Sequence, residues 1–471
     1  MREGAKPIPW APAGPPVIAG QAAMEGVTEA GFLNLARAVC ARGQGVALIS
    51  GGGLDCATHS ILAWDPLLLL RSRGRALVLE SGGRMRSWRG DPLEALDRVL
   101  EVTRPDWPLS PVPFAGGLIG YAAYELKNQI ERLPQSAADD LDLPDMFWLM
   151  PGQVAVLERA SGRATWLALA WPGREAEGTA PPDFAAPIPP EAAPLKVGEL
   201  TSNFTHAAYL AALRRVRAYI RAGDVYQINL SQRFSFDLQG SPFALWERLL
   251  AVNPAPFYAF VNAGAHQALS TSMERFLFRR GAYLETRPIK GTRPRGRTPA
   301  EDEALRRALA ESPKDDAELS MIVDLLRNDL GRVCRRKSIR VARHKVVEGY
   351  QNVHHLVSTV TGELDPGVGP GRLLRAAFPG GSITGCPKIR AMEIIDELEP
   401  VVRHVYTGSM GYLGWHDNLD LSVAIRTAIH KEGRCHFAVG GGVVYDSDEE
   451  DEYQETLHKA RTLFEVARGL G

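Results

Sequence analysis

Lys290 is the residue whose type and setting most clearly permit chemistry, because it lies in a turn framed by Pro288 and Gly291. A lysine amine is a nucleophile at neutral pH only when its charged form is destabilised, by burial or by neighbouring positive charge. Candidate neighbours are the arginines on either side of it: Arg287, Arg293, Arg295 and Arg297. The alternative is a basic surface loop with a solvated lysine, and the turn alone does not separate the two.

Two expected helices carry pairs of carboxylates three residues apart. Asp315 and Glu318 form one pair, and Glu452 and Glu455 form the other, with Lys459 one turn further along. Residues at this spacing share a helix face. Brought together, the pairs would make an all-oxygen site without His or Cys, which suits Mg²⁺. A solvated acidic face is the alternative.

Two glycine-rich segments favour the binding of an anion. The stretch FPGGSITGCPK, residues 378–388, leads into a helix start, where main-chain amides and the hydroxyls of Ser382 and Thr384 form a site for a carboxylate or phosphate. The glycines at 440–442 interrupt an apolar strand. Close approach of a ligand explains them, and a bulge or barrel corner explains them equally well.

Three more polar residues stand singly in the sequence: His355, Tyr406 and Arg426. An arginine in an apolar strand needs an anionic partner if it is buried, and a substrate carboxylate or a structural glutamate would both serve. His355 has the right type for proton transfer, with a satisfied core histidine as the alternative.

Composition restricts the function classes. Lys+Arg (54) nearly balances Asp+Glu (55) over 471 residues, so there is no global field for nucleic acid or an anionic membrane. The 5 cysteines are far apart and lack metal-ligand spacing, which fits a reduced compartment. The amino terminus has no apolar signal core, and no apolar run is long enough to span a bilayer. We therefore expect a cytoplasmic protein with no nucleic-acid or membrane partner.

The elements that must position these residues mix helices with strands. Residues 205–222 have apolar positions at helical spacing, and residues 225–237 alternate, with Gln227 on a wholly polar face that meets water or lines a polar cleft. Other helices are expected over residues 32–41, 91–102, 313–328 and 451–467, and after Pro387. Because no regular β-α-β order or internal repeat is present, we predict an α+β fold with large antiparallel sheets.

The chain is predicted to divide into three parts. Residues 16–171 form an N-terminal region of short strands and turns, and residues 201–468 form a second region. Residues 172–200 are rich in Pro and Ala and cannot build a core, so they are expected to be an exposed connector.

A series of ordered segments resembles the chorismate-utilising enzymes. In chain order they are RPIKGTRPRG, AELSMIVDLLRNDLGRV, VHHLVSTVTGEL, FPGGSITGCPKIRAMEIIDELEP, GSMGYL, AIRTA and GGGVVYDSDEEDEYQETLHKA. The similarity is dense from Thr205 to Leu463 and thinner before that. It implies a chorismate-binding catalytic region over residues 201–468. It also implies a two-lobed fold like that of anthranilate synthase component I, with large antiparallel sheets flanked by helices and the active site in a cleft.

The resemblance also implies roles by position. Glu318 and Glu455, with Asp315 and Glu452 close behind, would bind Mg²⁺, which would hold the ring carboxylate of chorismate and help its 4-hydroxyl to leave. The enolpyruvyl carboxylate would be held by Arg426, Tyr406 and the amides of Gly440, Gly441 and Gly442. Gly291, Ser382 and Lys459 would line the pocket. The catalytic set would be Lys290, His355, Gln227 and Thr292, with His355 beside the leaving hydroxyl.

Two positions indicate one branch of this family. Gln227 stands where water-adding members have lysine, and Lys290 stands where anthranilate-forming members have alanine. In members like this chain, the lysine attacks C2 of chorismate and expels the 4-hydroxyl, and ammonia then adds at C4 and expels the lysine. The product is 4-amino-4-deoxychorismate, a precursor of 4-aminobenzoate and folate. No GxCxG nucleophile context is present, so a separate glutamine amidotransferase subunit, forming a heterodimer, is expected to supply the ammonia.

Other functions stay open at this point. One alternative is synthesis of anthranilate, and another is a non-catalytic subunit that binds chorismate or tryptophan and regulates an amidotransferase. The strand ending in Ser81, together with Pro256 and Phe257, resembles the tryptophan pocket of anthranilate synthase and is a candidate tryptophan site.

Overall fold

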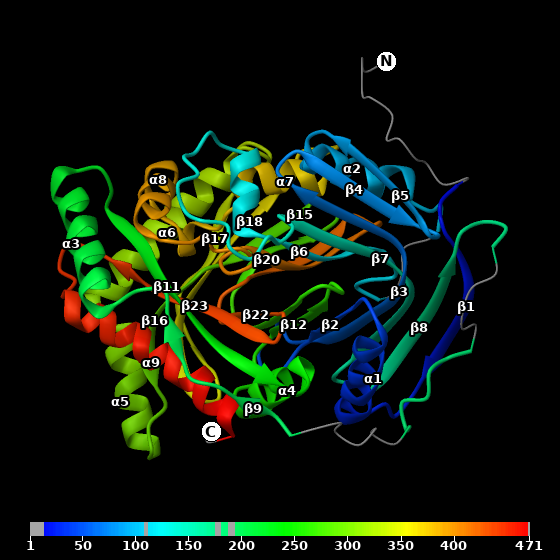
Figure 1. Ribbon diagram of the computed structural model, residues 1–471, viewed down its shortest axis with the longest axis horizontal. Helices are drawn as coiled ribbons and strands as arrows, with labels where there is room; N and C mark the ends of the chain where they lie inside the picture. Colours follow the sequence, from blue (N-terminus) through cyan, green and yellow to red (C-terminus); the bar gives the residue numbers. More distant parts are fainter. Residues whose placement is uncertain (1–13, 108–111, 175–179, 187–193, 470–471) are drawn as a thin grey trace.

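Antiparallel pairing between strands far apart in the sequence organises this protein, whose computed structural model describes residues 14–107, 112–174, 180–186 and 194–469. The strands join into one extensive sheet system with helices packed around it (Figure 1). This arrangement confirms the predicted α+β class with large antiparallel sheets. Parts of the predicted connector, residues 175–179 and 187–193, lie outside the described residues.

The N-terminal region is built on a long pair of antiparallel strands, β3 and β7. Every residue of β7 except Glu158 is buried, which matches its almost continuous apolar sequence. The elements of this region are β1 (Val17–Met24), α1 (Glu29–Arg42), β2 (Gly45–Ile49), β3 (His59–Arg73), β4 (Ala76–Ser81), β5 (Arg84–Arg89), α2 (Pro92–Val102), β6 (Gly117–Ala122), the short 3-10 helix η1 (Tyr124–Gln129), β7 (Met146–Glu158) and β8 (Arg163–Ala170).

The second region contains the elements that surround the candidate site. Its first half comprises β9 (Lys196–Val197), β10 (Thr201–Ser202), α3 (His206–Ala222), β11 (Gln227–Gln239), α4 (Pro242–Val252), β12 (Phe257–Asn262), β13 (Gln267–Ser272), β14 (Arg275–Arg280), β15 (Tyr283–Arg287), β16 (Ile289–Pro294), α5 (Pro299–Ala310) and α6 (Pro313–Gly331). Its second half comprises β17 (Arg340–Gly349), β18 (Val353–Glu363), α7 (Pro370–Ala377), η2 (Gly381–Ile383), β19 (Gly385–Cys386), α8 (Lys388–Leu398), β20 (Ser409–Gly414), β21 (Asn418–Val423), β22 (Thr427–Lys431), β23 (Arg434–Val443) and α9 (Glu449–Arg468).

The two regions share strand pairs. β2 of the N-terminal region pairs with β12, and β6 pairs with β20. The N-terminal strands therefore extend the same hydrogen-bonded system that carries the second region's strands. Within the described residues, no helix combines the length and the hydropathy needed to cross a bilayer.

Local sequence explains the elements nearest the site. Helix α3 starts after Thr205, whose hydroxyl accepts a hydrogen bond from the Ala208 amide, and it ends at Gly223, whose φ of 82° is the left-handed conformation that glycine adopts easily. The polar face of β11 is enclosed, since Gln227 and Ser231 are buried. The strand therefore lines an interior polar surface. Tyr226, which lies within the alternating segment 225–237, precedes the strand and is 70% exposed.

Candidate functional site

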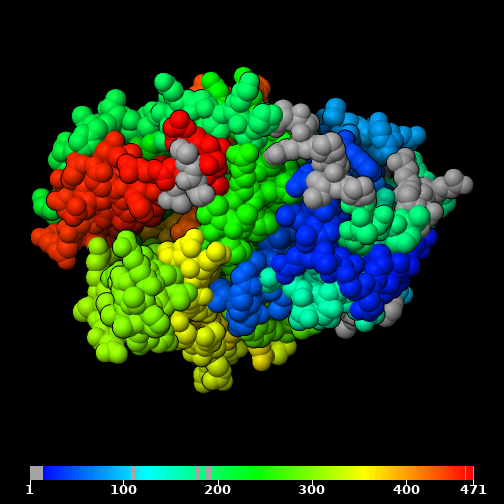
Figure 2. Space-filling view, turned by 90° about the horizontal axis from the view of Figure 1, so that it is seen from below, coloured from blue at the N-terminus to red at the C-terminus, as the bar shows by residue number. Residues whose placement is uncertain are grey.

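Five elements that carry predicted site residues lie in the same part of the molecule: strands β11, β16 and β23, and helices α6 and α9 (Figure 1). Seen from below, α9 and the α5 segment lie on the same face with a hollow between them (Figure 2). Within this group the structure brings together most of the residues predicted from the sequence.

Lys290 lies on β16 with its amine enclosed by neighbouring groups. Its Nζ donates a hydrogen bond to the main-chain carbonyl of Ser382 over 3.2 Å. A Cβ built on Gly442 would lie 3.7 Å from the same nitrogen, so β23 lies directly against the amine. Burial lowers the pKa of Lys290, while the carboxylates of Glu318 and Glu274 act in the opposite direction. Burial therefore favours the neutral, nucleophilic form of this amine.

The arginines flanking Lys290 in the sequence do not lower its pKa. Each is held by its own carboxylates: Arg287 by Asp55 and Glu285, Arg293 by Asp315, and Arg295 by Asp302. The prediction that neighbouring arginines lower the pKa of Lys290 is therefore wrong for these three arginines, because the charge of each is neutralised by a carboxylate. Desolvation is the physical cause instead.

Glu274 is a residue of this site that the sequence reasoning missed. Its buried carboxylate accepts a 2.6 Å hydrogen bond from the Ser382 hydroxyl. Burial raises the pKa of Glu274 to about 7, against the opposing effects of the Ser382 hydroxyl and the Lys290 charge. A carboxyl group with such a pKa exchanges protons near neutral pH. The sequence contains one signal that could have identified Glu274. It is a lone acidic residue between two strands, where charged side chains are rarely buried.

Ser382 thus contacts two reactive groups at once. Its carbonyl accepts from Lys290 and its hydroxyl donates to Glu274. The hydroxyl of Thr384 is also used within the protein, donating to the carbonyl of Gly380 over 3.1 Å. The two hydroxyls expected to cradle an anion are therefore engaged with protein acceptors.

Gln227 begins β11 and reaches the same group of residues. Its Nε2 donates to Glu318 over 3.4 Å, and its buried Oε1 has no hydrogen-bond partner among the described residues. A Cβ on Gly442 would collide with the Gln227 amide, which explains glycine at that strand position. A free acceptor beside the Lys290 amine is available to an N–H or O–H donor of a bound molecule.

The predicted metal ligands lie on α6 and α9. Burial raises the pKa of Glu318, and the nearby carboxylates of Asp315 and Glu455 add to this effect. Burial likewise raises the pKa of Glu452, whose Oε1 accepts a 2.7 Å hydrogen bond from Ser447. Mutual repulsion among these carboxylates is relieved by a cation, so the oxygen-only donor set fits Mg²⁺ chemically.

Two of the four carboxylates already have cationic partners. Glu455 pairs with Lys459 at 2.6 Å, and Asp315 pairs with Arg293 at 3.0 Å. In the described part of the chain, no group of three or more His, Cys, Asp or Glu side chains is arranged to hold a metal ion. Magnesium binding therefore stays a prediction.

The glycines at 440–442 form regular pairs with β11 and are not a bulge. A Cβ on Gly441 would lie 2.8 Å from Glu452 Oε2, so glycine there leaves room for the α9 carboxylate. The carbonyl of Gly440 accepts a 2.9 Å hydrogen bond from Lys459. These glycines allow charged side chains to lie close against the strand.

Arg426 has the properties expected of an anion-binding residue. Its φ of 48° is unusual for a residue with a side chain and is typical of functional sites. Burial lowers the pKa of its guanidinium, and no carboxylate pairs with it among the described residues. Tyr406 is buried, and burial raises its pKa to about 12. A structural glutamate, the alternative partner for Arg426, is therefore not found in the described ranges.

His355 lies on β18 opposite Thr292 of β16. Its Nδ1 is 3.2 Å from the Gly291 carbonyl and 3.0 Å from the Thr292 hydroxyl. The carbonyl can only accept, so the proton of the neutral ring belongs on Nδ1 and the lone pair on Nε2. Burial lowers the pKa of His355 to about 4, with the charge of Arg426 adding to the effect, and Nε2 has no partner in the described residues.

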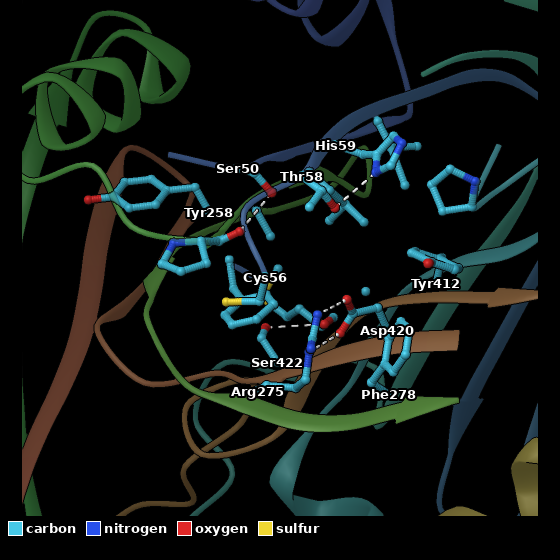
Figure 3. Close-up of a pocket in the computed structure, with 18 of the residues that line it drawn as sticks. Ser50, Cys56, Thr58, His59, Tyr258, Arg275, Phe278, Tyr412, Asp420 and Ser422 are labelled. Carbon is cyan, nitrogen blue, oxygen red and sulfur yellow. Dashed lines mark hydrogen bonds and ion pairs between the residues drawn. The ribbon is translucent and has the colours of Figure 1, made fainter. Parts of the chain in front are cut away.

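A second cavity of about 410 Å³ lies apart from Lys290 (Figure 3). Pro256 and Phe257, two residues of the candidate tryptophan site, line this cavity. Ser81, the third, is not among its lining residues, and its hydroxyl donates to the Leu67 carbonyl over 2.6 Å. Ser50, which follows β2, lines the cavity instead and donates to the Pro256 carbonyl over 2.9 Å. Tryptophan binding stays a prediction. Other lining residues labelled in Figure 3 include Cys56, His59, Arg275, Tyr412 and Asp420.

The family of the chain follows from its similarity to known proteins. Residues 58–465 match the family described as chorismate binding enzyme, and the chain belongs to it. It is 40% identical over 420 residues to aminodeoxychorismate synthase component 1 of Salmonella typhimurium, covering 86% of this chain and 88% of that protein. It is 39% identical over 440 residues to anthranilate synthase component 1 of Cereibacter sphaeroides, covering 89% and 88%.

A solved structure supports the same assignment. The crystal structure of anthranilate synthase component I from Streptococcus pneumoniae TIGR4 is 31% identical, with a TM-score of 0.76 over 88% of this chain and 93% of that one. The chain is thus a chorismate-utilising enzyme with the predicted anthranilate synthase component I-like fold. Relatives with two different activities match at similar identity, so similarity leaves the product undecided.

Proposed function

We propose that this enzyme aminates chorismate to 4-amino-4-deoxychorismate, using ammonia from a separate glutamine amidotransferase subunit. The observation that carries the proposal is the enclosed amine of Lys290, which lies beside the Glu274 carboxyl group and is held by Ser382. A buried amine next to a proton donor is suited to displacing a hydroxyl group from an allylic ring carbon.

In the first displacement, the neutral amine of Lys290 attacks C2 of chorismate. Both double bonds of the ring diene shift by one position, and the C4–O bond breaks. Glu274, protonated over part of the neutral range, gives its proton to the departing oxygen, which leaves as water. His355, neutral and with Nε2 free of protein partners, is the second proton acceptor at the site.

In the second displacement, ammonia attacks C4 and the bond between C2 and the Lys290 nitrogen breaks. The new ammonium group passes a proton to the Glu274 carboxylate left by the first step, which restores the starting acid. Both ring double bonds return to their original positions. One water is released for each ammonia consumed, so the two steps balance.

Substrate binding requires two separate anion sites, because chorismate carries two carboxylates. Arg426 and Tyr406, with the amides of Gly440, Gly441 and Gly442, are proposed to hold the enolpyruvyl carboxylate. Glu318 and Glu455, with Asp315 and Glu452 close behind, are proposed to hold Mg²⁺. That ion, when bound, supplies a positive charge for the ring carboxylate and for the departing hydroxyl.

Anthranilate synthesis is the second candidate, favoured by relatives of that name at similar identity. In the resemblance noted above, members that make anthranilate have alanine at the position of Lys290, which favours amination at C4 for this chain. A purely regulatory, non-catalytic subunit is disfavoured because all four carboxylates and the lysine are in place.

The product decides between these functions. The protein is incubated with chorismate, Mg²⁺ and an ammonium salt at alkaline pH, and the products are separated with and without the lyase that converts 4-amino-4-deoxychorismate to 4-aminobenzoate. We expect 4-aminobenzoate only when the lyase is present. Anthranilate formed without the lyase would overturn the assignment. With glutamine as the sole nitrogen source, turnover is expected only after the amidotransferase subunit is added.

A further inference from the structure

Arg403 is a buried arginine that none of the assigned roles uses. It follows helix α8 and is 5% exposed. Its guanidinium donates to both oxygens of Glu399, over 2.8 and 2.6 Å. It also donates to two main-chain carbonyls, those of Ile383 over 3.0 Å and Asn229 over 2.6 Å. The Arg403 guanidinium therefore joins three separate segments of the chain, those that contain Asn229, Ile383 and Glu399.

One of the segments that Arg403 joins contacts both reactive groups. Ile383 directly follows Ser382, whose carbonyl and hydroxyl hold Lys290 and Glu274. The Ile383 carbonyl receives a second hydrogen bond, from the Asn229 side chain over 3.2 Å. These two hydrogen bonds to the Ile383 carbonyl hold the short η2 turn in place.

Glu399 completes the connection to strand β11. It accepts hydrogen bonds from both the amide and the hydroxyl of Ser231, each over 2.8 Å. Burying an ion pair costs desolvation energy and is weak evidence for stability. A pair that is hydrogen-bonded on every side instead fixes the relative positions of the segments it contacts.

The N-terminal region contributes to the same arrangement. The Arg403 guanidinium lies over the ring of Tyr124, 4.9 Å from its centroid, and 5.9 Å from the centroid of the Tyr406 ring. The Arg403 amide donates to Glu125 over 3.1 Å, and the Tyr124 amide donates to the His404 carbonyl over 2.7 Å. Tyr124 and Glu125 of η1 therefore contact Arg403 and help to hold it in place.

We propose that Arg403 is a positioning residue for the amination reaction, which acts by holding the Ile383 carbonyl and thereby Ser382 against Lys290 and Glu274. The inference rests on the proposed roles of those two reactive groups. It adds that the N-terminal region, through Tyr124, helps to position Lys290 and Glu274.

The first test is Arg403→Lys. Lysine keeps a positive charge opposite Glu399 but cannot reach this carboxylate and both carbonyls at once. Because small misplacements of reactive groups are costly, kcat is expected to fall by about 10²-fold. The KM for chorismate should stay within about threefold of the wild-type value, because the carboxylate-binding groups remain.

A double-mutant cycle with Ser382→Ala identifies the route of the effect. Ser382→Ala removes the hydroxyl that contacts Glu274 and keeps the carbonyl that contacts Lys290. If Arg403 acts through Ser382, the loss of kcat in the Arg403→Lys/Ser382→Ala enzyme should be clearly smaller than the product of the two single losses. Multiplied losses of kcat would mean independent effects and would overturn the proposal. A raised KM at unchanged kcat would overturn it as well.

Arg279→Lys is the matched control. Arg279 is also buried and donates to the carbonyls of Gly281 and Val368 and to Asp417, with no contact to the candidate site. Its loss should lower Tm, as Arg403→Lys does, while kcat changes by no more than about twofold. An equal loss of kcat in both variants would assign Arg403 a structural role only.

If Arg403→Lys does not fold, Tyr124→Leu decides the question. This variant removes the aromatic ring that the Arg403 guanidinium lies over. We expect kcat to fall about tenfold at nearly constant KM. Unchanged kcat in a folded Tyr124→Leu enzyme would then overturn the proposal. All these rates are measured on whichever amine product the wild type forms, so an error in the product assignment leaves the outcome of this test intact.

Discussion

The amine of Lys290 donates a hydrogen bond to the main-chain carbonyl of Ser382 over 3.2 Å. A carbonyl accepts from either protonation state of an amine, so this contact holds the nitrogen in place without demanding that it be charged. Burial meanwhile lowers the pKa of the lysine. The same surroundings thus hold the nitrogen in place and favour its neutral form, which is the form that acts as a nucleophile.

Lys290→Ala should reduce formation of 4-amino-4-deoxychorismate by about three orders of magnitude or more, since the covalent route is lost. Product formation is followed by coupling to the lyase, and folding is checked by Tm. Lys196→Ala, at an exposed position on β9, is the control and should retain full activity. Wild-type activity in Lys290→Ala would exclude the covalent mechanism.

Glu274→Gln should reduce kcat by about 10² to 10⁴-fold, because the departing hydroxyl loses its proton donor. Glutamine keeps the shape and still accepts the hydrogen bond from Ser382. Ser320→Ala on α6 is the control, since that hydroxyl donates to Asp316 and has no other hydrogen bond among the described residues. Unchanged kcat in Glu274→Gln would remove this carboxyl group from the mechanism.

Glu274 also predicts how stability depends on pH. Its pKa is raised from 4.5 to about 7 by burial, so between these values the folded protein binds more protons than the unfolded chain. The free energy of unfolding therefore falls as pH rises through this window, by up to about 3 kcal/mol for a shift of this size. Denaturant unfolding of wild type and Glu274→Gln at pH 5 and pH 8 measures the difference. Equal pH dependence in the two proteins would contradict the raised pKa.

Magnesium dependence is predicted to require the α6 and α9 carboxylates. Glu318→Gln or Glu455→Gln should abolish turnover that depends on Mg²⁺, because each removes a negatively charged oxygen ligand. Initial rates are measured across a Mg²⁺ titration, with added EDTA as the metal-free reference. Glu465→Gln, at an exposed position on the same helix α9, is the matched control. Metal dependence that is unchanged in Glu318→Gln and Glu455→Gln would exclude both as ligands.

Patterns of spacing predicted the elements well. Helix α6, expected over 313–328, spans Pro313–Gly331, and α9, expected over 451–467, spans Glu449–Arg468, because caps and apolar periodicity are local signals. Spacing also placed Asp315 and Glu318 correctly on one helix. These features depend on neighbours in the chain, which the sequence displays directly.

Features that depend on partners far away in the chain were missed. Burial raises the pKa of Glu274, and its hydrogen-bond partner Ser382 is more than a hundred residues further along the chain. Ser81 and Ser50 both end apolar strands, and only the pairing of β2 with β12 places Ser50 at the second cavity. Arg287 is close to Lys290 in the sequence, but its side chain pairs with Asp55. No local pattern contains this information.

Arg426 offers a test that separates binding from folding. Because its buried guanidinium has no carboxylate partner among the described residues, Arg426→Gln should not lower the free energy of unfolding, whereas removal of a paired buried arginine would. The KM for chorismate should rise by about 10 to 100-fold through loss of charged hydrogen bonds to a carboxylate. Chorismate should raise the Tm of the wild type more than that of Arg426→Gln. A large loss of stability with unchanged KM would show that Arg426 serves the fold and not the substrate.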